Sequence, residues 1–126
     1  MSDDELTLLG RDARGPVDHV ETFPAPVGCT RVVFTGDEVT SLCPVTGQPD
    51  ISSVRIDYVP AERCIESKSL KMFLWGFRNR EVFAEALAVA IADEVWETAA
   101  PASVDVIVTQ HVRGGIVTET HSSHPR

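Results

Sequence analysis

The chain contains little positive charge and no long hydrophobic run, and each shortage excludes a class of protein. Only 11 of its 126 residues are Lys or Arg against 19 Asp or Glu, giving a formal net charge of -8. This balance argues against direct nucleic-acid binding through phosphate neutralisation. No apolar run approaches the roughly 18 to 20 residues that span a bilayer, and the acidic stretch at 1–10 is unlike a secretory signal. We therefore expect a cytoplasmic protein without a membrane segment.

Cysteine is also scarce, which excludes a disulfide framework and paired zinc ligands. Cys29, Cys43 and Cys64 are odd in number and irregularly spaced, whereas both kinds of site need paired cysteines. The four histidines have no ligand spacing beside a carboxylate or a cysteine. We predict reduced thiols and no metal, in a chain long enough to bury one core unaided.

Hydrophobic patterning predicts one α+β domain over residues 22–120, between a polar N-terminal arm at 1–21 and a polar tail at 121–126. Strand-like patterns occur at 29–35, 51–59, 104–112 and 116–120. The helical pattern of the first predicted helix consists of Leu70, Phe73, Leu74 and Phe77, and an almost wholly apolar second helix covers 81–97. The order β-β-α-α-β-β predicts an antiparallel four-stranded sheet with both helices on one face.

A turn-rich segment at 36–50 is predicted to be a functional loop because of its length and composition. Cys43 lies inside it, where a scaffold can present a nucleophile. Asp50, at the start of the next strand, could fold back and exchange a proton with the thiol. A plain turn with a capping aspartate would explain the same residues.

One basic island interrupts the acidic chain, at Ile65–Arg80, with four basic residues and one acidic residue. Lys68, Lys71 and Arg78 share a helical face there. Such a face attracts an anionic ligand such as a phosphate, or is simply solvated. The segment Arg113-Gly114-Gly115 likewise allows close approach of a ligand, or forms an ordinary hairpin turn.

Glu85 shares an apolar helical stripe with Ala88, Val89, Ala92 and Trp96. A buried carboxylate needs hydrogen-bond partners, and the N–H groups of a purine-type ring would serve. Arg55 or another chain could instead pair with it. The residues alone leave these alternatives open.

Several blocks together resemble the 7-cyano-7-deazaguanine reductases, the QueF family. They are CPVTGQPD at 43–50, YVP at 58–60, ESKSLK at 66–71, FRN at 77–79 and RGGI at 113–116. The resemblance implies a tunnelling fold (T-fold), whose units pair their sheets into barrels. It also implies a homo-oligomer with active sites at subunit interfaces.

The same resemblance implies reduction of the nitrile of 7-cyano-7-deazaguanine to 7-aminomethyl-7-deazaguanine in queuosine biosynthesis, with NADPH as cofactor. Cys43 would form a covalent thioimide with the nitrile and Asp50 would transfer protons, while Phe83 and Glu85 would hold the ring. The residues that the resemblance implies would bind NADPH are Glu66, Ser67, Lys68, Ser69, Lys71, Arg78, Arg113 and Gly114.

Ala84 stands where this family usually has a histidine. One alternative is a QueF-like amidinotransferase, which adds ammonia to the nitrile in archaeosine formation. The other is a non-catalytic T-fold module that binds the purine without turnover. The amidinotransferases lack a full cofactor block, so the ESKSLK sequence favours the reductase.

Overall fold

The computed structural model describes residues 15–126, so the first fourteen residues of the predicted arm lie outside it. The elements follow in the order β1 (Thr22–Pro24), β2 (Val32–Leu42), β3 (Pro49–Val59), β4 (Arg63–Ile65), α1 (Ser67–Trp75), α2 (Ala84–Ala99), β5 (Ser103–Arg113) and β6 (Ile116–His124). The four long strands and both helices correspond to predicted elements. The three-residue strands β1 and β4 are too short to carry a readable pattern and were not predicted.

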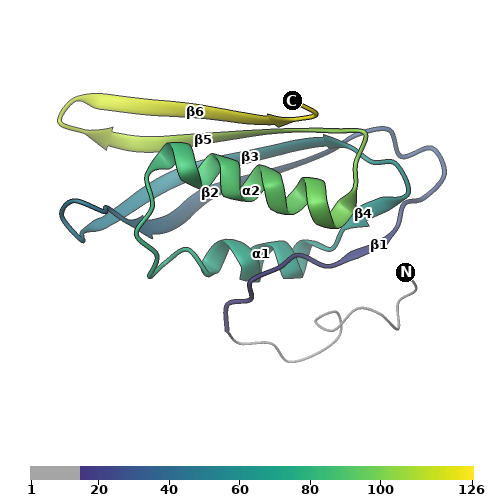
Figure 1. Ribbon diagram of the computed structural model, residues 1–126, viewed down its shortest axis with the longest axis horizontal. Helices are drawn as coiled ribbons and strands as arrows, with labels where there is room; N and C mark the ends of the chain where they lie inside the picture. Colours follow the sequence, from purple (N-terminus) through teal and green to yellow (C-terminus); the bar gives the residue numbers. More distant parts are fainter. Residues whose placement is uncertain (1–14) are drawn as a thin grey trace.

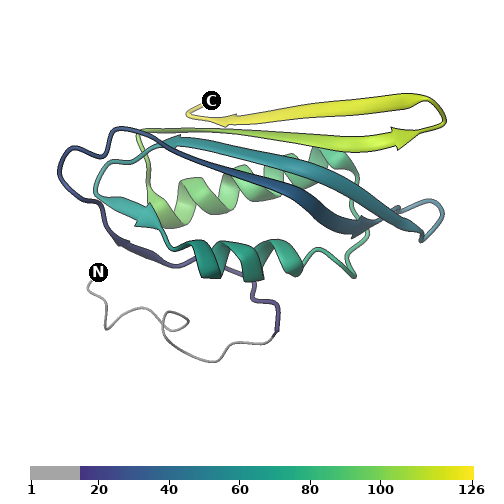
Figure 2. The ribbon, with the colours of Figure 1, turned by 180° about the vertical axis from the view of Figure 1, so that it is seen from behind.

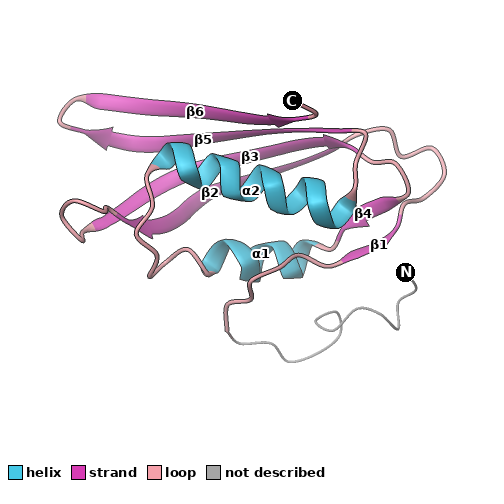
Figure 3. Ribbon diagram, in the orientation of Figure 1, coloured by secondary structure: helices cyan, strands magenta, loops and turns pink. Residues whose placement is uncertain are grey.

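The long strands form one antiparallel sheet in the order β2-β3-β5-β6. Both helices lie on one side of it, with α2 against β5 and β6 and α1 beside β2 (Figure 1, Figure 3). Seen from behind, the opposite face of the sheet carries no helix (Figure 2). This arrangement confirms the predicted α+β architecture.

The core lies between the sheet and α2. Every second residue of β3 and of β5 is buried, as expected for strands with one covered face. The helix supplies Leu87, Ile91 and Val95, which are at most 1% exposed. Burying a side chain of this size contributes about 1.5 to 3 kcal/mol, so this contact holds the helix on the sheet.

The predicted loop at 36–50 is too long, because β2 continues to Leu42 and only residues 43–48 form the turn. Val39 and Ser41 point inward and are 4% and 1% exposed. The register shifts between Gly36 and Val39. Such a bulge reverses the alternation of side chains, and this reversal makes the strand look irregular in the sequence.

The two ends of the described chain are better packed than predicted. Strand β6 runs to His124, whose ring stacks on Trp96 with 5.1 Å between centroids and whose Nε2 lies 2.7 Å from Asp93. Residues 121–124 therefore belong to the sheet and not to a polar tail. Near the other end, Val20 is 2% exposed and its N–H donates to Glu94 at 2.9 Å, so the end of the predicted arm is docked.

A matched pair of truncations on α2 tests this packing. Ile91→Ala should lower the free energy of unfolding by about 2 to 5 kcal/mol, because it leaves a cavity in the core. Val89→Ala, on the same helix but with its side chain 40% exposed, should change it by roughly 0.5 kcal/mol or less. Urea denaturation followed by circular dichroism measures both, and equal losses would contradict this orientation of α2.

Candidate active site

Cys43 follows β2 directly and lies in a turn that its own backbone closes. Its N–H donates to the Gln48 carbonyl and its carbonyl accepts from the Gly47 N–H, both at 2.8 Å. Gly47 has a φ of +72°, a backbone conformation that glycine adopts without strain. The Cys43 side chain is 7% exposed. The turn therefore holds the thiol in one place at the end of the sheet.

Hydrogen bonds from this turn favour the thiolate form of Cys43. The Thr46 hydroxyl and the backbone N–H groups of Thr46 and Val45 lower the pKa of the thiol, while burial and the charge of Asp50 oppose them. The Gln48 N–H donates to Thr46 Oγ1 at 3.2 Å, which leaves the hydroxyl hydrogen available for the sulfur. Because the thiolate is the reactive nucleophile, these bonds prepare Cys43 for addition to an electrophile.

Asp50 lies near Cys43 and is engaged by Arg113. Its carboxylate, on β3, is 6% exposed and forms an ion pair with the guanidinium of Arg113 at the end of β5. The hydrogen bond to Asp50 is the main cause that raises the pKa of Arg113, and interaction with the Cys43 sulfur adds to it. Sequence resemblance assigned Arg113 to NADPH, whereas here it lies with the nucleophile and its acidic neighbour.

The two residues predicted to hold the substrate lie at the start of α2. Leu42 donates to the Arg80 carbonyl at 3.0 Å and accepts from the Val82 N–H at 3.1 Å, which ties the connection before α2 to the Cys43 turn. Phe83 caps the helix and Glu85 lies in its first turn. Both views show this connection, the β2–β3 turn and the β5–β6 turn at the same end of the molecule (Figure 1, Figure 2).

Glu85 is exposed in this chain, so the expectation of a buried carboxylate is wrong for the single subunit. The face of α2 toward the core is made by Ala84, Leu87, Ala88 and Ile91, and Glu85 projects away from it. The alternative pairing with Arg55 is wrong as well, because Arg55 pairs with Asp57 at 3.3 Å on the sheet. Phe83 is also exposed, at 53%.

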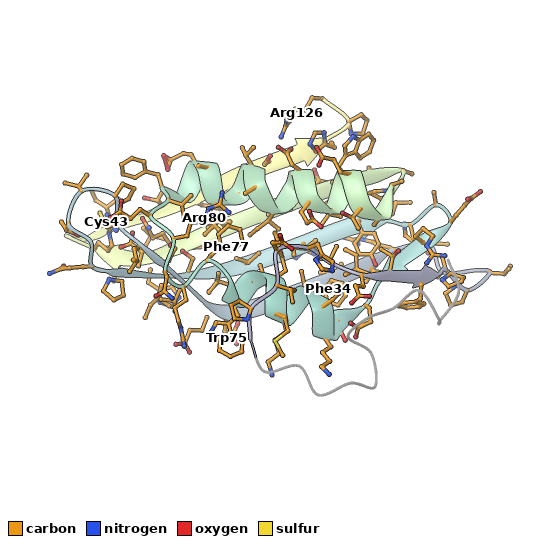
Figure 4. The ribbon with its side chains drawn as sticks, turned by 60° about the horizontal axis from the view of Figure 1, so that its bottom comes forward. Phe34, Cys43, Trp75, Phe77, Arg80 and Arg126 are labelled. Carbon is orange, nitrogen blue, oxygen red and sulfur yellow. The ribbon has the colours of Figure 1, made fainter. Side chains whose placement is uncertain are left out.

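A groove of about 510 Å³ lies between β2 and α1. Its polar donors from the predicted cofactor block are Ser67, Lys71 and Arg78. The guanidinium of Arg78 lies over the Trp75 ring at 5.9 Å, and Figure 4 shows Trp75 at the surface of the molecule. Lys68, predicted for the same face, is only partly exposed and does not line the groove.

The other two residues of this block support the helix from within. Glu66 caps α1, with its carboxylate accepting the backbone N–H groups of Lys68 at 2.8 Å and Ser69 at 2.7 Å. The Ser69 hydroxyl donates to the Glu66 carbonyl at 2.7 Å and accepts from the Glu21 N–H at 2.8 Å. Both side chains are buried, so their contact with NADPH stays a prediction.

The glycines after Arg113 have a local explanation. Gly114 and Gly115 have φ values of 59° and 81°, as a tight hairpin turn between β5 and β6 requires. A role of Gly114 in cofactor binding stays a prediction. The hydroxyl of Thr46 is the functional group that our sequence analysis missed, although its position in a turn three residues after a cysteine was a usable signal.

Within residues 15–126 no three His, Cys, Asp or Glu side chains gather in a way that would hold a metal ion. No helix in this part of the chain is long and apolar enough to cross a membrane.

Two comparisons with known proteins agree on one family. A family model described as QueF-like protein matches residues 49–126. The NADPH-dependent 7-cyano-7-deazaguanine reductase of Anaeromyxobacter sp. (strain Fw109-5) is 43% identical over 115 residues, covering 87% of this chain and 94% of the relative. The protein of the same name from Frankia casuarinae is 39% identical over 121 residues, covering 96% of this chain and 97% of the relative.

Among solved structures, the archaeosine synthase QueF-Like in its apo form superposes with a TM-score of 0.71 at 24% identity. The match covers 75% of this chain and 92% of that chain. At this identity the likeness shows the fold alone, and it confirms the tunnelling fold.

Removing the Thr46 hydroxyl should raise the pKa of the Cys43 thiol, because the sulfur loses its only side-chain donor among the causes that lower it. Thr46→Val tests this with nearly unchanged shape, and Thr46→Ser restores the hydroxyl as a control. The pH dependence of iodoacetamide labelling at Cys43, followed by peptide mass spectrometry, measures the shift. A midpoint for Thr46→Val equal to that of the unaltered protein would contradict the role of Thr46.

Proposed function

This chain belongs to the QueF family, and we propose that it catalyses the NADPH-dependent reduction of 7-cyano-7-deazaguanine to 7-aminomethyl-7-deazaguanine. The reaction belongs to queuosine biosynthesis. The observation that carries the proposal is the Cys43 turn, where a buried thiol with a lowered pKa lies within electrostatic reach of Asp50. The identity to reductases over most of the chain gives independent support.

Addition to the nitrile needs only groups of this chain. The Cys43 sulfur forms a bond with the nitrile carbon, and one π pair of the C≡N bond moves to nitrogen. The proton that left the thiol reaches that nitrogen through Asp50, which acts first as base and then as acid. The product is a thioimide, and this step neither consumes nor releases electrons.

The groove along α1 fits the phosphates of NADPH by its donor set. Lys71 and Arg78 supply two positive charges against the one lining carboxylate, Glu38, while Ser67 adds a hydroxyl and Trp75 aromatic surface. Charged donors of this kind bind phosphate oxygens strongly. When bound there, NADPH would supply the hydrides that the reduction of the thioimide to the amine requires.

In this proposal Glu85 and Phe83 bind the deazaguanine ring of the substrate. A carboxylate can accept two N–H donors from a guanine-like edge, and an exposed aromatic ring can cover its face. Ala84, between them, is 4% exposed and packed in the core, so its methyl group offers the substrate no polar contact. We propose that a second copy of the chain closes this pocket in a homo-oligomer.

The amidinotransferase reading is less well supported. The archaeosine synthase shares the fold at 24% identity, whereas the reductases share 38% to 43% identity. The groove lined by Lys71 and Arg78 could bind a cofactor that carries phosphates. A reductase needs such a cofactor, whereas an enzyme that adds ammonia to the nitrile does not. A single catalytic domain and a cytoplasmic location stay predictions.

Cys43→Ala should abolish both covalent capture and turnover. Mixing the protein with 7-cyano-7-deazaguanine should raise its intact mass by one ligand mass, and adding NADPH should lower the absorbance at 340 nm. Cys29→Ala, which removes a thiol outside this turn, is the control and should keep both. A surviving adduct in Cys43→Ala would exclude this nucleophile, and ammonia-dependent product without NADPH loss would identify the transferase.

Substitutions in the groove should separate cofactor binding from nitrile addition. Lys71→Ala or Arg78→Ala should raise the KM for NADPH roughly tenfold, about 1.4 kcal/mol, while adduct formation without NADPH stays unchanged. Lys68→Ala removes the same charge outside the groove lining and should have a smaller effect. Steady-state kinetics and intact mass measure the two steps. An unchanged KM for NADPH in Lys71→Ala and Arg78→Ala would favour a merely solvated face.

A further inference from the structure

Arg113 is the cation that the fold brings to the Cys43 turn. Its guanidinium pairs with the buried Asp50 carboxylate and interacts with the Cys43 sulfur. The phosphate-binding candidates are Lys71 on α1 and Arg78 just after it, and Arg113 is not among the residues that line their groove. The two sets of basic residues therefore occupy different places, although sequence resemblance assigned them one task.

A bulge in β5 explains how Arg113 reaches this position. Val104, Val106, Val108 and Gln110 are buried, so simple alternation would place residue 113 on the face of the sheet without helices. The pairing register with β6 shifts between Gln110 and Arg113. Bulges re-aim side chains in this way and are frequent beside active sites. The shift brings Arg113 to the side of the sheet on which Asp50 is buried.

We propose that Arg113 is a catalytic residue of nitrile addition, whose guanidinium stabilises the negative charge of Cys43 and Asp50 while the thiol proton passes to Asp50, before any cofactor binds. The proposal rests on the function proposed above. It differs from a cofactor-binding role because it assigns Arg113 to a step that precedes hydride transfer and takes place without NADPH.

The physical reason is charge balance in a partly buried site. The negative charge of Asp50 raises the pKa of Cys43, since two neighbouring anions repel each other. Arg113 places a permanent positive charge against both groups, because a guanidinium does not lose its proton in proteins. With it, the thiol proton can pass to Asp50 and leave the thiolate, and the protonated Asp50 then gives that proton to the nitrile nitrogen.

The other charged groups near the turn are few. Asp50 approaches Cys43 from β3 and Arg113 from the end of β5. The connection beside Leu42 contributes the exposed Arg80 and Glu81. Asp50 is the charged side chain among the causes that shift the pKa of the Cys43 thiol, and the Cys43 sulfur is among the causes that raise the pKa of Arg113. A change in Cys43 titration on altering Arg113 therefore reports on the Asp50–Arg113 pair.

A double-mutant cycle tests the proposal with two measurements made without NADPH. The variants are Arg113→Gln, Arg113→Lys, Asp50→Asn and the double variant Asp50→Asn/Arg113→Gln. The first measurement is the pH midpoint of Cys43 labelling by iodoacetamide, read by peptide mass spectrometry. The second is the rate of adduct formation with 7-cyano-7-deazaguanine, read by intact mass. Arg126→Gln breaks a comparable pair with Asp93, at 3.1 Å, away from Cys43 (Figure 4), and serves as the control.

Arg113→Gln should move the labelling midpoint to higher pH and slow adduct formation at neutral pH roughly tenfold or more. Arg113→Lys keeps the charge and should recover part of both. The double variant should return the midpoint toward that of the unaltered protein, because it removes both charges, and a loss of local structure would not be reversed in this way. Arg126→Gln should change neither measurement.

The proposal would be overturned if Arg113→Gln left the labelling midpoint and the adduct rate unchanged and raised only the KM for NADPH. Arg113 would then be a cofactor-binding residue. A double variant no closer to the unaltered midpoint than Arg113→Gln would also overturn it. If the unaltered protein forms no adduct, the proposed function fails instead. The labelling midpoints would then still decide whether Arg113 offsets the charge of Asp50 at Cys43.

Discussion

Two backbone hydrogen bonds at Leu42 hold the functional end of this protein together. Through them the last residue of β2 is tied to the connection between the helices, which lies about forty positions further along the chain. Cys43 follows Leu42 directly, and α2 begins two residues after Val82. Buried backbone N–H and C=O groups need hydrogen-bond partners, and these two bonds supply them for Leu42. They also fix the position of Cys43, the proposed nucleophile, relative to Glu85. The geometry of the site thus depends on main-chain pairing more than on any contact between side chains.

The parts of the structure that follow a regular period could be predicted from the sequence, and the parts that depend on a break in the period could not. The stripe Leu70, Phe73, Leu74 and Phe77 predicted α1, and Leu70, Phe73 and Phe77 are buried as expected. The length of β2 and the position of Arg113 were missed for one shared reason. Each depends on a bulge, which leaves composition unchanged but reverses the face of every later residue in the strand.

The exposure of Glu85 and Phe83 bears on how the substrate ring would be held. In open water a carboxylate already has hydrogen-bond partners, so exchanging them for ring N–H groups stabilises a complex only modestly. The same bonds discriminate between ligands when water is excluded. A ligand without matching N–H groups would then leave the carboxylate buried and unpaired, which costs desolvation free energy. A single subunit leaves both residues open. Recognition at this position therefore requires a cover, which in our proposal is a second copy of the chain.

The basic residues of this acidic chain lie in two places, and in our proposal each place serves one step of the reaction. The sheet and its turns hold the three groups that we propose for addition to the nitrile: Cys43, Asp50 and Arg113. They are therefore assembled whether or not a cofactor is present. Lys71 and Arg78 lie on the helix side of an open groove, where a large anion can enter and leave. Reduction of a nitrile to an amine consumes two hydrides, so the cofactor must exchange once while the substrate stays. In our proposal, a fixed covalent site at Cys43 and an open groove for the cofactor meet that requirement.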